Sequence, residues 1–428
     1  MSHERGTFAS SVFTLTNSAV GSGILAFPFA FRCGGILGGS IMSIFFGLTN
    51  TWSLTLIIEA CHATNSTNYQ QIIRKLCGHR AETVVGALIF LYAWLADVGF
   101  FIIIADLLRP LLILWIGDGL WTQRWFILAV ASILILPLML LRRITSLQLS
   151  SMFALFSILY VVGMISYFGI CKISPSLNDE ISDDSPSSVS LWPKGTDFVL
   201  AVPVTCLALQ CHVQVPAIYA EVRPDLRSPE WMKWVIYTSI TICLVLYIPA
   251  GIFGYVTFND DTPADILEDK KYPADNAAVE LARVCIILTS ICCIPLNHFP
   301  ARLAAYEILR GKYREEVEYK LMLENLREEQ QQPADIPSRF YYLEAFCFYV
   351  SAYMLALILP DIDVVLDIMG ATAGVAVIFI LPGIMLYKLN SHANKRRSCA
   401  WLLGCLGVVV GLACIGAFVL KTFFEGLL

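Results

Sequence analysis

Small and polar residues interrupt the first long apolar segment of the chain, Leu15–Pro28. This stretch carries, among apolar neighbours, Thr16, Asn17, Ser18, Gly21, Ser22, Gly23 and Pro28. Lipid offers no partners to backbone N–H and C=O groups, so an unwound stretch at bilayer depth is tolerated only where it lines an enclosed cavity or binds a ligand. The pattern predicts a broken helix that binds a substrate or an ion. Close helix packing at Gly21 and Gly23 is the alternative interpretation.

A second apolar segment, Ala201–Pro216, is interrupted in a similar way. It contains Pro203 and Pro216 and the polar residues Gln210, His212 and Gln214. Proline removes a backbone donor and clashes with the preceding turn of a helix. The segment is therefore predicted to break between Thr205 and His212.

Two interrupted spans at matching positions in the two halves of a chain point to a transporter site, since inverted repeats bring their half-helix ends together near the bilayer midplane. Half-helix N-termini suit a carboxylate, and unwound carbonyl groups suit an ammonium. Because the first span carries no charged residue between Phe8 and Phe31, the pair predicts a site for a zwitterion such as an α-amino acid.

The elements that position these residues are membrane spans. The 428 residues have a mean hydropathy of +0.68 and are 57% hydrophobic and 15% charged, which excludes a water-soluble domain. A span needs roughly 20 apolar residues, and on that criterion the chain is an all-α polytopic membrane protein with eleven spans. Their predicted centres are Ala19, Leu48, Ala96, Ile133, Leu159, Ala208, Leu246, Leu288, Val350, Val375 and Gly411.

The spans predict one transmembrane domain over the whole chain. Spans one and six are five apart, as a five-plus-five inverted repeat requires, with repeats near 7–172 and 196–390 and an extra helix near 400–422. A charged stretch near 303–338 is expected to form a cytoplasmic helical connector that ends at Pro333. Most of the 29 Lys and Arg residues fall in the loops that share a side with the N-terminus, which places the N-terminus in the cytoplasm and the C-terminus outside it.

Few ionisable residues lie inside the spans. Asp97 falls at the centre of the third span, the most costly position for a charge, so it is a candidate for ion coupling. His212 can titrate near neutral pH, although a structural histidine beside the break is the alternative.

Several motifs in this order resemble the system A/N type of neutral amino acid transporter, in the amino acid/auxin permease family. They are Thr16–Leu25, Gln210–His212 with Ile218 and Tyr219, Tyr69–Gln70 with Leu76–Gly78, Gly254–Phe258, and Gly370–Thr372 with Ile380–Gly383. The resemblance covers nearly the whole chain. It implies the fold of the bacterial leucine transporter, in the amino acid, polyamine and organocation (APC) superfamily, with substrate held between the breaks in spans one and six.

The resemblance also implies coupling to sodium or protons. Asn17 matches a family asparagine linked to sodium and substrate, and Thr289 and Ser290 are the hydroxyl candidates in the eighth span. If that hydroxyl position falls on Cys293 instead, a thiol is a poor ligand for a hard cation and proton coupling is favoured. The predicted substrate residues are Asn17, Ser18, Val20, Gly21, Ser22, Gly23, Thr205, Cys206, Gln210 and His212. The predicted ion-coupling residues are Asn17, Val20, Thr289, Ser290, Asp97 and His212.

These observations favour a secondary active transporter of neutral L-amino acids of the glutamine or alanine kind. No nucleotide-binding motif, clustered catalytic set or channel-like polar repeat is present, so no enzyme activity, no cofactor, no nucleic-acid partner and no metal other than sodium are expected. Two alternatives stay open. One is a sensor that signals through cytoplasmic loops, and the other is sodium-independent proton symport or antiport. The plasma membrane and the lysosomal membrane fit the spans equally, and oligomeric state is not indicated.

Overall fold

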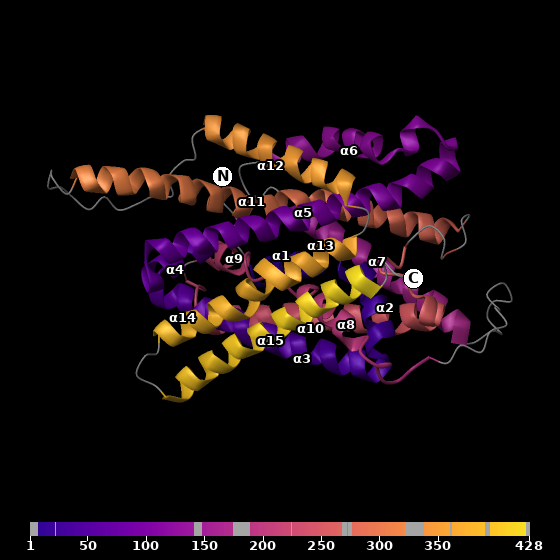
Figure 1. Ribbon diagram of the computed structural model, residues 1–428, viewed down its shortest axis with the longest axis horizontal. Coiled ribbons are helices and arrows are strands. Elements are labelled where there is room, and N and C mark those ends of the chain that lie inside the picture. Colours follow the sequence, from indigo (N-terminus) through magenta and orange to yellow (C-terminus); the bar gives the residue numbers. More distant parts are fainter. Residues whose placement is uncertain are drawn as a thin grey trace.

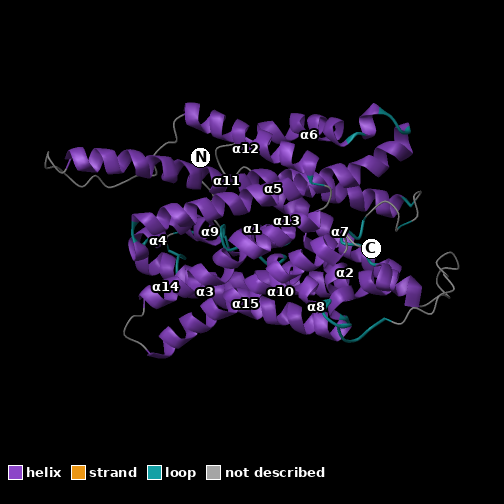
Figure 2. Ribbon diagram, viewed as in Figure 1, coloured by secondary structure: helices purple, strands orange, loops and turns teal. Residues whose placement is uncertain are grey.

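A computed structural model gives the fold of the chain. It describes residues 7–21, 23–140, 148–173, 189–223, 225–267, 272, 276–321, 338–359, 362–389 and 394–424. Within these ranges every element is a helix (Figure 2).

The helices lie side by side in one bundle (Figure 1). In chain order they are α1 (Phe8–Ala19), α2 (Gly23–Gly34), α3 (Ile36–Thr64), α4 (Tyr69–Cys77), α5 (His79–Ile116), α6 (Arg124–Met139), α7 (Gln148–Ile173), α8 (Phe198–Leu207), α9 (Val215–Glu221), α10 (Pro229–Phe258), α11 (Ala277–Leu321), α12 (Ser338–Ile358), α13 (Ile362–Met369), α14 (Leu381–Leu389) and α15 (Asn394–Phe424). Short 3-10 turns cover Leu120–Thr122 and Asn259–Asp261, and π-helical turns over Gly370–Gly374 and Ala376–Ile380 join α13 to α14.

The eleven predicted spans correspond to these helices. Among the described residues, eight helices are long and apolar enough to cross a membrane, and α1 with α2 forms a bent ninth. The shorter apolar helices α6 and α8 complete the set, α8 together with α9. The prediction of a polytopic, all-helical fold with interrupted first and sixth spans is confirmed.

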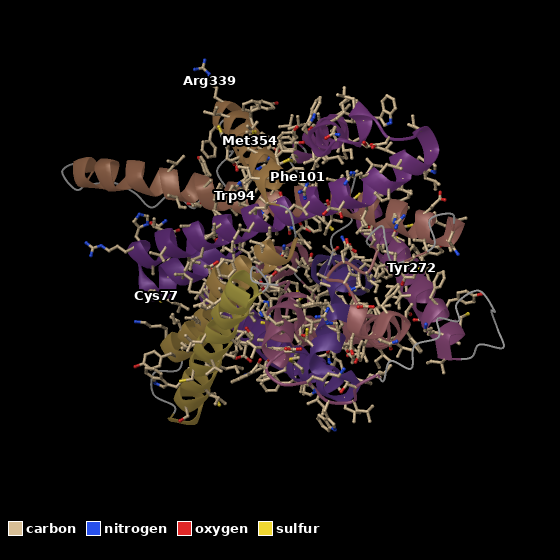
Figure 3. All side chains as sticks on the ribbon, turned by 45° about the vertical axis from the view of Figure 1, so that its right-hand side comes forward. Cys77, Trp94, Phe101, Tyr272, Arg339 and Met354 are labelled. Atoms are coloured by element: carbon tan, nitrogen blue, oxygen red, sulfur yellow. The ribbon has the colours of Figure 1, made fainter. Side chains whose placement is uncertain are left out.

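Helix α5 is central to the packing of one half of the bundle. It packs most extensively against α11 and also contacts α6 and α12. Trp94 Nε1 donates a hydrogen bond of 2.9 Å to Ser351 Oγ on α12, and the rings of Phe101 and Tyr349 pack edge to face at 5.2 Å (Figure 3). In the other half, α10 packs on α1, α2, α3 and α7, so it lies against both parts of the first broken span.

Helix α11 continues far beyond the length of a span. Its 45 residues cover roughly 68 Å at 1.5 Å per residue, whereas the hydrocarbon core is about 30 Å thick. Figure 1 shows its second half projecting from the left of the bundle. The first part of the predicted connector at 303–338 is thus a direct extension of span eight, and its predicted end at Pro333 lies outside the described residues.

A buried ionic cluster joins α11, α12 and the end of α6. Glu344 accepts a hydrogen bond from Arg302 Nε at 3.2 Å and lies 3.1 Å from His298 Nε2. Arg302 Nη2 also donates to the Met139 carbonyl at 2.7 Å and contacts His298 Nδ1 at 3.0 Å. Because arginine can only donate, Nδ1 is the acceptor, and the hydrogen of His298 sits on Nε2 and points to Glu344.

Candidate substrate site

The first break lies where the glycines predict it. Helix α1 ends at Ala19, α2 begins at Gly23, and their axes differ by 58°. Val20 closes α1 with a non-helical backbone at φ −89° and ψ 61°. The C-terminal carbonyls of α1 and the N-terminal N–H groups of α2 therefore meet at the same point, without intrahelical partners.

The second break is longer. Helix α8 ends at Leu207 and α9 begins at Val215, so residues 208–214 separate the two half-helices. The prediction of a break between Thr205 and His212 is confirmed, with its start displaced to Ala208. Pro216 sits in the first turn of α9, where its missing N–H costs nothing.

The two breaks contact each other. A Cβ on Gly23 would lie 3.1 Å from both Cα and Cβ of Ala208, so only glycine allows this approach without displacing the neighbouring backbone. The Tyr247 hydroxyl of α10 lies 3.1 Å from the Ala19 carbonyl and 3.0 Å from the Ala208 carbonyl. One hydroxyl hydrogen serves either acceptor in turn, and Tyr247 thereby links the end of α1 to the end of α8.

Replacement of Tyr247 by Phe should weaken this link while keeping the ring, which stacks on Phe27 at 4.5 Å. The two buried carbonyls lose their donor, at a cost of about 1–3 kcal/mol. We expect both thermal stability and transport to fall. Tyr255→Phe is the matched control, since its hydroxyl accepts a hydrogen bond from the Ser190 N–H, which belongs to neither break. Transport and melting temperature are measured for both variants. If transport falls by the same amount for each degree of lost melting temperature in the two variants, Tyr247 has no role in transport beyond its contribution to stability.

A cavity of about 80 Å³ lies beside the breaks. Its wall comes from both broken spans and from α5, α11 and α13, and every side chain that lines it is uncharged. The polar members are Ser18, Tyr92, Gln210 and Asn297. Tyr92 donates a hydrogen bond of 2.5 Å to Gln210 Oε1, while Gln210 Nε2 has no hydrogen-bond partner within the described residues. An amide N–H beside the cavity is thus available to a ligand.

A polar contact separates this cavity from a smaller one. Gln214 Nε2, at the start of α9, donates to Asn297 Oδ1 of α11 at 3.3 Å. Asn297 lines the larger cavity, Gln214 lines a second cavity of about 30 Å³ between α1, α9 and α11, and Ser18 lines both. The Gln214–Asn297 bond therefore joins a lining residue of one cavity to a lining residue of the other.

Asp97 lies directly behind this contact. Its side chain is 0% exposed on α5, and the amide of Asn297 on α11 is its polar neighbour. Neither carboxylate oxygen makes a hydrogen bond of normal geometry to the described residues. A carboxylate in such a position is costly unless it is neutral or paired with a cation.

Comparison with known proteins identifies the family. The family model described as "Transmembrane amino acid transporter protein" matches residues 4–424. The chain belongs to this transmembrane amino acid transporter family. Sodium-coupled neutral amino acid transporter 7 of Xenopus laevis is 29% identical over 98% of this chain and 90% of its own length, and its human counterpart is 27% identical over 97% and 87%. Vacuolar amino acid transporter 6 of Saccharomyces cerevisiae is 26% identical over 95% and 98%. Membership makes the chain a transporter of amino acids and excludes an enzyme.

The transporter places four of the predicted substrate residues at the larger cavity: Ser18, Gly21, Gly23 and Gln210. The other predicted substrate residues, apart from Ser22, are buried in the broken spans but do not line it. They are Asn17 on α1, Val20 in the first break, Thr205 and Cys206 on α8, and His212 in the second break. Ser22 lies outside the described residues.

The predicted ion-coupling residues are dispersed. Thr289 Oγ1 donates to Cys285 of its own helix, whereas the hydroxyl of Ser290 is buried without a hydrogen bond to the described residues. His212 is fully buried, and neither of its ring nitrogens has a hydrogen-bond partner among the described residues. Asp97 is the member that lies beside Asn297, a lining residue of the larger cavity.

The sequence reasoning missed Tyr92, Asn297 and Tyr247. Each is a polar side chain in an apolar span, and this placement alone could have marked it. The three side chains meet the breaks because α5, α10 and α11 pack there, and the sequence alone does not show that packing.

Proposed function

We propose that the protein carries small neutral L-amino acids by secondary active transport. The observation that supports this most directly is the uncharged lining of the cavity between the two breaks. A charged substrate side chain would be buried there without a counterion, at a high cost. An uncharged side chain meets only apolar groups, hydroxyls and amides.

The backbone of the site suits the charges that every amino acid carries. The N-terminus of α2 at Gly23 offers free N–H groups to a carboxylate. Ala19 and Ala208, at the ends of α1 and α8, line the same cavity. Their carbonyls share the single Tyr247 hydroxyl and keep lone pairs that suit an ammonium. The available volume, about 80 Å³, corresponds to roughly five to eight water-sized groups, enough for alanine and tight for glutamine.

Coupling to sodium or to a proton is part of the proposal. The name of the animal relatives supports sodium, and the buried carboxylate of Asp97 supports a proton.

The distribution of Lys and Arg supports a cytoplasmic N-terminus and an extracytoplasmic C-terminus. The name of the yeast relative, a vacuolar transporter, supports an acidic organelle such as the lysosome, with the plasma membrane as the second location.

Counterflow in proteoliposomes tests the proposal. Vesicles loaded with unlabelled alanine should accumulate labelled alanine, and lysine or glutamate inside should not drive this exchange. Repeating the assay with choline in place of sodium, and across pH, identifies the coupling ion. Binding of alanine without any exchange would favour a sensor. Equal exchange with lysine would contradict selectivity for neutral amino acids.

A further inference from the structure

A large groove between α14 and α15 lies outside the transport pathway. Its volume is about 780 Å³, within the range of sites that bind small organic ligands. The residues that line it are Ile380, Gly383, Ile384, Tyr387, Lys388, Ala400, Trp401, Gly404, Cys405, Val408 and Val409. Helix α15 lies on the outside of the bundle (Figures 1 and 3), and its span is the least buried of those the structure describes. The groove therefore faces lipid.

Glycine residues let α14 and α15 pack closely at the base of the groove. A Cβ on Gly383 of α14 would lie 3.0 Å from the Ala400 carbonyl of α15, so this glycine lets the two backbones touch. The Cα of Gly404, one turn further along α15, has open space where a side chain would project. The absence of a side chain at Gly404 is what leaves the groove open.

The groove is apolar along most of its length and basic at one end. Its walls are aliphatic and aromatic, and the one charged side chain in its lining is Lys388, at the end of α14. Lys388 is exposed and makes no ion pair with the described residues. Lys395, Arg396 and Arg397 follow in the first turn of α15, which contains no acidic residue. Cys77 at the end of α4, near Lys388, marks the same end of the bundle (Figure 3).

We propose that this groove binds an anionic glycerophospholipid. An acyl chain lies along the wall between Ile380 and Val409, and the headgroup phosphate lies at Lys388. A basic site between spans at the membrane surface is the arrangement that selects anionic headgroups. A second copy of the chain fits less well, because its helix would have to bury Lys388 against apolar surface. This inference is independent of the transported substrate.

Native mass spectrometry of the purified full chain, exchanged into vesicles of phosphatidylcholine and phosphatidylserine and then extracted, tests the proposal. We expect retained phosphatidylserine in excess of its share in the vesicle. Lys388→Gln should lower that retention about fivefold, from a contribution of roughly 1 kcal/mol for each cation, without changing retention of phosphatidylcholine. Gly404→Leu fills the groove and should abolish retention of both lipids at this site.

Two control variants separate the groove from general effects. Gly163→Leu adds the same side chain at another exposed glycine with open space, on α7. Lys172→Gln removes a cation from the end of the same helix. Neither should alter lipid retention. The proposal is overturned if Lys388→Gln retains phosphatidylserine as the unmodified chain does, if Gly404→Leu does not reduce retention, or if wild-type chains dimerise through this face and Gly404→Leu dissociates them.

Discussion

Asp97→Asn is expected to lower the accumulation of amino acid driven by a pH gradient at least tenfold relative to the unmodified transporter. Exchange at equal pH should stay largely intact. Asparagine has the shape of the neutral acid and keeps a polar contact with Asn297, but it cannot take up or release a proton. Because Asp97 is fully buried beside the Gln214–Asn297 contact, we expect a change in its charge to alter the strength of that contact. Uptake of labelled alanine into proteoliposomes with an acidic exterior, with an acidic interior and with equal pH on both sides measures both quantities.

Asp106→Asn on the same helix is the matched control for Asp97. Asp106 is about half exposed and lies 3.5 Å from Arg124, a pairing that contributes little in solvent, so its loss should leave accumulation unchanged. Undiminished accumulation in Asp97→Asn under a pH gradient would rule out Asp97 as the proton carrier. If accumulation instead follows sodium in both proteins, attention turns to Ser290, whose buried hydroxyl has no hydrogen bond to the described residues.

The breaks could be predicted from the sequence because their cause is local. Gly21 and Gly23 weaken a helix wherever they occur, and a proline such as Pro216 is favoured in the first turn of one. The spans could be predicted for a related reason, since the apolar run that crosses lipid is contiguous in the chain. These features require no knowledge of what packs against them.

The composition of the site was less predictable because it depends on contacts between distant segments. Asn17 lies on the last turn of α1 and Gln210 within the second break, yet only Gln210 reaches the cavity. Neighbouring positions on a helix direct their side chains to different partners, and Asn17 is directed away from the cavity while Ser18 lines it. Tyr247 lies 228 positions from its partner Ala19, so no local pattern could pair them. The volume of the cavity likewise depends on how six helices pack, α1, α2, α5, α8, α11 and α13.

The second large effect is expected at the ionic cluster of α11 and α12. Glu344→Gln should destabilise the protein by about 3–5 kcal/mol, because it leaves Arg302 as a buried cation without a counterion. Arg302 and Glu344 are only 3% and 7% exposed, so water cannot replace the lost carboxylate. The melting temperature of the purified chain in detergent, followed by tryptophan fluorescence, measures the change. Glu59→Gln is the matched control, since its pairing with Lys233 at 3.0 Å is about one third exposed and should contribute at most about 1 kcal/mol.

A double variant separates loss of the ion pair from loss of packing. Adding Arg302→Gln to Glu344→Gln removes the orphaned cation and should recover part of the lost stability, because the penalty comes from the unpaired charge rather than from the missing bond. His298 can then donate from Nε2 to the amide at position 344 as it does to the carboxylate. A double variant no more stable than Glu344→Gln alone would show that the contacts of Arg302 with the Met139 carbonyl and the Tyr341 ring, 3.8 Å away, hold these helices together more strongly than the ion pair does.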